Sequence, residues 1–295
     1  MSTDRSRRFR KGFGAAALAA LLPLTACAGS DADSASPPPS SITQAAAHTD
    51  QQHLSLTIPG TLAAGFAEWQ AGMRGRAGMA VMPVGGDKMV TFGDWTTGPA
   101  WSTMKIPLTV AALRRGTVNT TYAATAAITQ SDNAAADTLW QSLGSSQEAA
   151  KAVEAVLREG GDTKTTVPSA KPRADVSAFG QADWALTEQV RFASRLPCLS
   201  QTGNVISLME QITPNQRWGL GAFTGAEFKG GWGPDASGQY LVRQFGLVPT
   251  AGGQIAIAFA VQPDSGAFSD GMTALDKLAT LVSQHLDELS GGACS

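Results

Sequence analysis

Residues 101–115 read WSTMKIPLTVAALRR, a stretch that joins two chemically suggestive side chains to an apolar helical pattern. The apolar residues of 106–113 recur at helical spacing, so the sequence predicts a helix that begins at Ser102. Residues three apart on a helix share a face, which would place Ser102 and Lys105 one turn apart. A serine needs a nearby base to become a nucleophile, and an amine with a lowered pKa can serve. The positive N-terminal end of a helix disfavours an ammonium and favours an oxyanion.

The same spacing has a second interpretation. Ser102 could be a helix-capping serine, with Lys105 a solvated surface residue. Two later stretches bear on the choice between these interpretations: Ser131-Asp132-Asn133 and Lys229-Gly230-Gly231.

Composition narrows the possible functions. The chain has 295 residues, of which 43% are hydrophobic, and this size and composition suit one large globular domain or two small ones. The formal net charge is −2. This charge gives no indication of a nucleic-acid partner. The only histidines are His48, His53 and His285, and the first two fall in a predicted linker. We therefore expect neither a Ser-His-Asp triad nor a histidine zinc site, and we predict no metal and no other cofactor.

The N-terminus has the pattern of an export signal. Basic residues within 5–11 precede the apolar run 12–24, which is too short to span a bilayer. The following Leu24-Thr25-Ala26-Cys27 resembles a bacterial lipobox, which predicts cleavage after residue 26 and a lipid on Cys27. An ordinary secretory signal with an unmodified cysteine is the alternative. The export route, general or twin-arginine, stays open.

Three regions follow from this pattern. Residues 1–26 are the predicted signal peptide, and residues 27–55, rich in Ser, Ala and Pro, are a predicted flexible tether. Residues 56–295 are the predicted folded domain. We expect an exported protein anchored by its lipid to the outer face of a bacterial cell membrane, and we expect a monomer.

Two cysteines remain once Cys27 carries a lipid. Cys198 and Cys294 can pair in only one way, and an exported protein meets oxidising conditions, so we expect a disulfide. Two buried free thiols are the alternative.

The apolar patterns predict the order of the elements. Strands are expected at 77–83 and 89–95, and three more at 227–232, 240–248 and 254–261. Helices are expected at 62–73, through much of 102–212, and at 271–289. This order predicts an α+β fold with two lobes: a five-stranded antiparallel sheet covered by the first and last helices, and a reduced helical lobe at about 102–220. A site would lie in the cleft between the lobes.

The three motifs Ser102-x-x-Lys105, Ser131-Asp132-Asn133 and Lys229-Gly230-Gly231 occur in this order along the chain. Together they resemble the penicillin-interacting serine enzymes, above all the class A β-lactamases, over about Leu62 to Leu289. The runs 216–221 and 228–233 resemble actinobacterial lipoproteins of this superfamily.

The resemblance implies catalytic roles for three residues. Ser102 would attack an amide or lactam carbonyl and form an acyl-enzyme. Lys105 would accept or relay the proton of Ser102, and Ser131 would pass a proton to the leaving nitrogen.

The resemblance also implies substrate-binding roles. Asn133 would hold the side amide of the substrate. Lys229 would keep the site positive, lower the pKa of Lys105 and attract a carboxylate. The backbone N–H groups of Ser102 and Trp232 would hold the oxyanion, and Asp132 would stabilise a turn.

The chain departs from the class A pattern in three places. Gly230 replaces a hydroxyl residue that would bind the substrate carboxylate. The loop 161–180 contains no glutamate to activate a deacylating water; we expect Asp175 to pin this loop and Asp162 to be a weak substitute base. Ser102 and Ser131 are 29 residues apart, about half the usual separation, which suggests that part of the helical lobe is missing.

Two functions follow. The first is a serine acyl-enzyme, a hydrolase or acyl-transferase that acts on β-lactams or on peptide-like, peptidoglycan-like amides and deacylates slowly. The second is a non-catalytic lipoprotein that keeps the fold as a binding module. The joint presence of Ser102, Lys105, Ser131, Asn133 and Lys229 favours the first.

Overall fold

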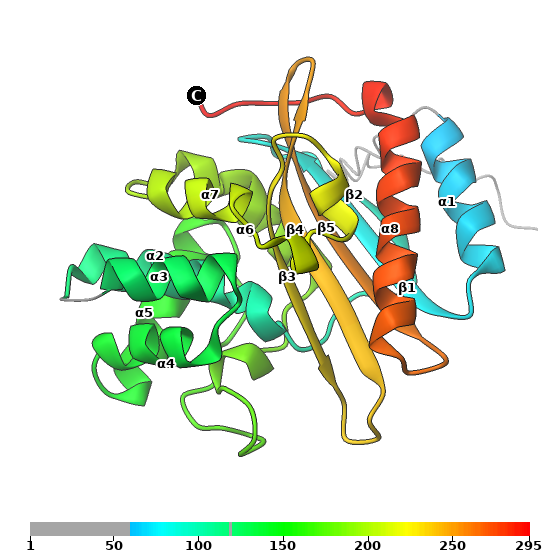
Figure 1. Ribbon diagram of the computed structural model, residues 1–295. Coiled ribbons are helices and arrows are strands. Elements are labelled where there is room, and N and C mark those ends of the chain that lie inside the picture. The colour runs from blue at the N-terminus through cyan, green and yellow to red at the C-terminus, as the bar shows by residue number, and fades with distance from the viewer. Residues whose placement is uncertain (1–59, 118–119) are drawn as a thin grey trace, which may run out of the picture. The chain divides into compact units, whose positions relative to one another are not determined.

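A five-stranded antiparallel sheet forms the centre of the protein (Figure 1). The computed structural model describes residues 60–117 and 120–295, all within one compact unit. The predicted signal peptide and the whole predicted tether, which includes Cys27, lie outside the described residues. The strand order is β2-β1-β5-β4-β3, with β1 at Gly75–Pro83, β2 at Val90–Gly93, β3 at Glu227–Pro234, β4 at Tyr240–Thr250 and β5 at Gly253–Pro263.

Helices cover both faces of the sheet. Figure 1 shows α1 (Gly60–Gly72) and α8 (Phe268–Gln284) on one side and α6 (Leu186–Arg195) on the other. Every residue from 241 to 248 and from 255 to 261 is therefore buried, which explains the continuous apolar run of β5. The predicted fold class is confirmed. The segment 183–196, expected in the helical lobe, instead packs on the sheet.

The helical lobe lies beyond β3 and is built around α2 (Lys105–Arg115). Asp132 caps α4 by accepting a hydrogen bond from the Ala135 N–H at 2.7 Å, the turn-stabilising role expected for it. Ser145 and Glu148 form a capping box for α5. The helices that contact α2 are α3 (Thr120–Thr129), α4 (Asn133–Ser142), α5 (Ser146–Glu159) and α7 (Gly203–Glu210).

The start of α2 differs from the prediction. Residues Trp101–Met104 form a 3₁₀ helix, η1, and the α-helix begins only at Lys105. No side chain caps either helix, and Lys105 is only 1% exposed. The interpretation of Ser102 as a capping serine beside a solvated lysine is therefore wrong.

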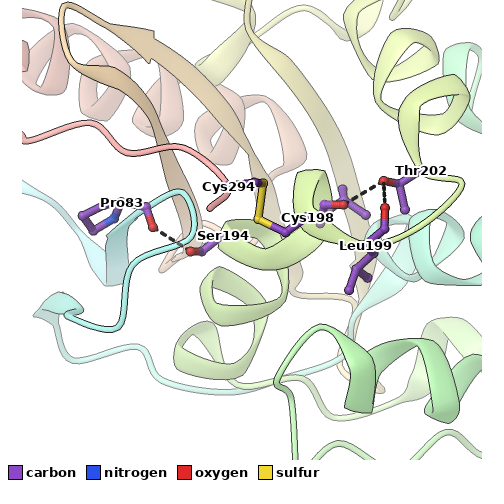
Figure 2. The surroundings of a disulfide bond; sticks show 7 residues. Pro83, Ser194, Cys198, Leu199, Thr202 and Cys294 are labelled. Atoms are coloured by element: carbon purple, nitrogen blue, oxygen red, sulfur yellow. Dashed lines mark hydrogen bonds between the residues drawn. A yellow bond between two sulfur atoms is a disulfide. The ribbon is translucent and has the colours of Figure 1, made fainter.

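The disulfide between Cys198 and Cys294 is present and joins the end of the chain to the short helix after α6 (Figure 2). Hydrogen bonds hold this region: the Ser194 hydroxyl donates to the Pro83 carbonyl at 2.6 Å, and Thr202 donates to the Leu199 carbonyl at 2.9 Å. The bond closes a span of 96 residues, for which chain entropy predicts a stabilisation of about 4–5 kcal/mol.

Within the described ranges, no helix is both long enough and apolar enough to cross a membrane.

Candidate active site

The 3₁₀ helix that carries Ser102 lies against the edge strand β3. The two backbones come close together at Gly231, where a Cβ atom would lie 3.0 Å from the Ser102 nitrogen and 2.9 Å from the Thr103 nitrogen. These separations are too short for any side chain larger than hydrogen. Glycine at position 231 is therefore what lets the backbone of the strand approach the backbone of Ser102.

A buried network of polar side chains binds this 3₁₀ helix and the residues just before it. The Arg243 guanidinium, on β4 opposite Gly231, donates to the carbonyls of Gly98 and Pro99 and to Gln189 Oε1 at 2.8 Å. Gln189 in turn donates to Thr103 Oγ1 at 3.0 Å. Burial lowers the pKa of Arg243 to about 9, although the charge of Asp183 raises it.

Strained backbone is concentrated on either side of the site. Trp101 has φ 49° and Ser131 has φ 59°; the only other non-glycine residue of the described chain with positive φ is Gln201. This left-handed conformation costs a non-glycine residue about 1–2 kcal/mol. The Trp101 indole N–H is also buried without a hydrogen-bond partner in the described structure. Strain that persists at one place is a common property of functional sites.

Two lysine amines converge on Ser131. Lys105 Nζ donates to the Ser131 carbonyl and to Asn133 Oδ1 at 2.8 Å, and lies 3.4 Å from Ser131 Oγ. Lys229 Nζ donates to Ser131 Oγ at 2.9 Å and to the Gly230 carbonyl at 2.9 Å. Within residues 60–117 and 120–295, neither lysine forms an ion pair, and no hydrogen bond joins Ser102 to Lys105.

Burial lowers the pKa of both amines. It lowers the pKa of Lys105 to about 7, although the charges of Asp132 and Asp137 raise it. Burial and then the charge of Lys105 lower the pKa of Lys229 well below its ordinary value. Desolvation is thus the main cause of the lowered Lys105 pKa, a role that the sequence interpretation gave to Lys229. A neutral Lys105 near pH 7 can accept a proton.

A cavity of about 270 Å³ opens beside Ser102. Trp101, Trp232 and Tyr240 supply its aromatic wall, and Asn133 and Asp137 lie on the helical side. Sequence analysis missed Tyr240 and Asp137. Asp137 could have been found from the sequence, because it is four residues after Asn133 on one helix and therefore shares its face.

The space beside Gly230 is occupied. A Cβ at Gly230 would lie 3.0 Å from the Trp218 ring. Trp218 packs edge-on against Trp232 and Phe268, with ring centroids 5.9 and 6.2 Å apart. The indole therefore fills the position in which the expected hydroxyl side chain would stand.

The role expected for Asp162 is wrong. Asp162 is completely buried and accepts hydrogen bonds from the Lys164 and Thr165 backbone and from Trp184 Nε1 at 2.9 Å. Asp162 therefore pins the loop and is turned away from solvent, which excludes it as a base. Asp175 is exposed on the cavity wall and pairs with Arg173 at 2.8 Å.

Known structures share this fold. Over 76–78% of the chain it superimposes on TLA-3 extended-spectrum β-lactamase (14% identity, TM-score 0.63), a β-lactamase from Xanthomonas campestris (17%, 0.61) and a class A β-lactamase from Mycobacterium abscessus (18%, 0.60). The matches cover 98–99% of those proteins. No protein-family model and no curated protein matches the sequence. At these identities the likeness establishes the fold, that of class A β-lactamases.

We predict that Gly231→Ala lowers the free energy of unfolding by about 1–3 kcal/mol, because the methyl group must push β3 away from the backbone of Ser102. Gly203→Ala is the matched control, since a Cβ there meets nothing within 4 Å. Urea denaturation of both variants measures the difference. Equal stability of the two variants would contradict the proposed close contact.

Proposed function

We propose that this chain is a serine acyl-enzyme that attacks the carbonyl of a β-lactam or a peptide-like amide. The observation that carries the proposal is the convergence of the buried Lys105 and Lys229 amines on Ser131, beside the cavity that Ser102 lines. The likeness to class A β-lactamases supports the same chemistry.

The acylation step follows from these groups. The neutral Lys105 amine accepts the Ser102 proton as Ser102 Oγ bonds to the carbonyl carbon. The C–N bond then breaks, and the nitrogen takes a proton from the Ser131 hydroxyl, which Lys105 reprotonates. Backbone N–H groups of Ser102 and Trp232 would hold the oxyanion. Asn133 Oδ1 already accepts from Lys105, so its amide N–H₂ is the part that would hold a substrate carbonyl.

Release of the acyl group is proposed to be slow. The loop 161–180 has no glutamate, and its buried Asp162 is committed to three hydrogen bonds. An acyl-enzyme would therefore accumulate, as it does in enzymes whose second step limits turnover.

The alternative is a non-catalytic binding module. The Trp218 ring in place of a hydroxyl at position 230 favours this alternative, because a group that would bind the substrate carboxylate is absent. The buried amines and the strained residues Trp101 and Ser131 favour the enzyme. These features cost stability, and a site that had lost its chemistry could replace them with apolar side chains at no functional loss.

Intact-protein mass spectrometry tests the acyl-enzyme. After incubation with benzylpenicillin we expect a mass increase of one acyl group on the unaltered protein and none on Ser102→Ala, because that variant lacks the nucleophile. Circular dichroism confirms that both proteins are folded. A folded protein that gains no mass from penicillins or activated serine probes would favour the binding module.

The pKa of Lys105 predicts a pH dependence for acylation. Only the neutral amine accepts a proton, so the rate should rise with pH and level off above a midpoint of about 7. Intact-protein mass spectra of reactions quenched at successive times, at several values between about pH 6 and pH 8, give this profile. Lys105→Gln should acylate at least about 100-fold more slowly. A rate that does not change across this interval would argue against Lys105 as the base.

The proposal includes export and a lipid on Cys27, which lies outside the described residues. An acyl anchor would hold the protein in the membrane fraction of the producing bacterium, and Cys27→Ser should release it into the soluble fraction. Immunoblots of the two fractions measure the distribution. A soluble unaltered protein would contradict lipid attachment.

A further inference from the structure

We propose that Asp137 is the general base that activates the deacylating water. This inference rests on the proposed function, because it assigns the second half of the same reaction. Asp137 lies on α4, one turn after Asn133, and it lines the same cavity as Ser102. Release of the acyl group remains slower than its formation, and Asp137 supplies the base that loop 161–180 lacks.

Two carboxylates line this cavity within the described residues, Asp137 and Asp175. Asp175 Oδ2 accepts a hydrogen bond from Arg173 at 2.8 Å, and this pairing lowers the pKa of Asp175. Such a carboxylate is a weakened proton acceptor. Asp162 is completely buried and does not line the cavity. The geometry therefore leaves Asp137.

The surroundings of Asp137 suit this role. Asp137 is half-buried, and in the described part of the chain its carboxylate forms no ion pair and no side-chain hydrogen bond. Both oxygens are free to bind water. The charge of Asp137 acts on Lys105, whose amine is 2.8 Å from Asn133 Oδ1. Asp137 therefore lies within electrostatic reach of the catalytic amine on the helix that also presents Asn133.

The step balances as an ester hydrolysis. A water oxygen bonds to the acyl carbon while Asp137 takes one of its protons, which gives a tetrahedral intermediate. The bond from the acyl carbon to Ser102 Oγ then breaks, and Ser102 regains a proton from the protonated base through Lys105. The product is a free carboxylic acid, and Asp137 is again a carboxylate. Water is the only co-reactant.

The lifetime of the adduct tests this assignment. Unaltered protein, Asp137→Asn and Asp175→Asn are acylated with benzylpenicillin, freed of excess reagent by rapid gel filtration and followed by intact mass. We expect all three to gain the adduct. The adduct on Asp137→Asn should persist about 100-fold longer than on the unaltered protein, since a general base contributes at least that much. The adduct on Asp175→Asn should have the unaltered lifetime.

Circular dichroism separates loss of the base from loss of the fold. Hydroxylamine, a stronger nucleophile than water, shows that the persistent adduct is an acyl ester. It should release the adduct from Asp137→Asn. Equal adduct lifetimes on the unaltered protein and Asp137→Asn, or a long lifetime on Asp175→Asn instead, would overturn the inference alone. If the unaltered protein forms no adduct, the proposed function falls and this inference falls with it.

Discussion

The burial of two lysine amines is the constraint on which the candidate site depends. Lys105 is 1% exposed and Lys229 is completely buried, and removing a charged amine from water costs several kcal/mol. The protein offsets this cost with oxygen acceptors and with lowered pKa values, and no carboxylate of the described residues forms an ion pair with either amine. Ser131 supplies its carbonyl to one amine and its hydroxyl to the other, which requires the turn between α3 and α4 to hold this residue at φ 59°. The strained turn at Ser131 therefore holds the acceptors of the two amines whose pKa values are lowered.

The sheet also fixes the position of Ser102. Because β3 is an edge strand, its outer side is free to contact the 3₁₀ helix, and Gly231 removes the side chain that would keep them apart. Arg243 on the neighbouring strand and Gln189 on α6 bind the backbone and side chains just before and within that helix. The position of Ser102 therefore depends on α6 covering its face of the sheet.

Motif spacing and apolar periodicity predicted the sheet, the two covering helices and most of the residues that gather at the site. They could not place α6, because periodicity reveals a buried face without naming its partner. Trp184 donates a hydrogen bond to the buried Asp162, and the Trp218 ring fills the space beside Gly230. Each tryptophan is far along the chain from the residue it contacts, so local sequence patterns could not predict either contact. The helix start at Lys105 was missed because a 3₁₀ turn and an α-helical turn share nearly the same spacing.

The disulfide has a consequence for the order of assembly. The covalent ring joins Cys198 to Cys294, so it closes only after synthesis has passed residue 294. Lys229 and Trp232 lie inside that ring, whereas Ser102, Lys105 and Ser131 precede it. A nascent polypeptide that has not reached Cys294 would therefore contain Ser102, Lys105 and Ser131 before the disulfide holds the segment that carries Lys229 and Trp232. The cavity would be completed late in assembly.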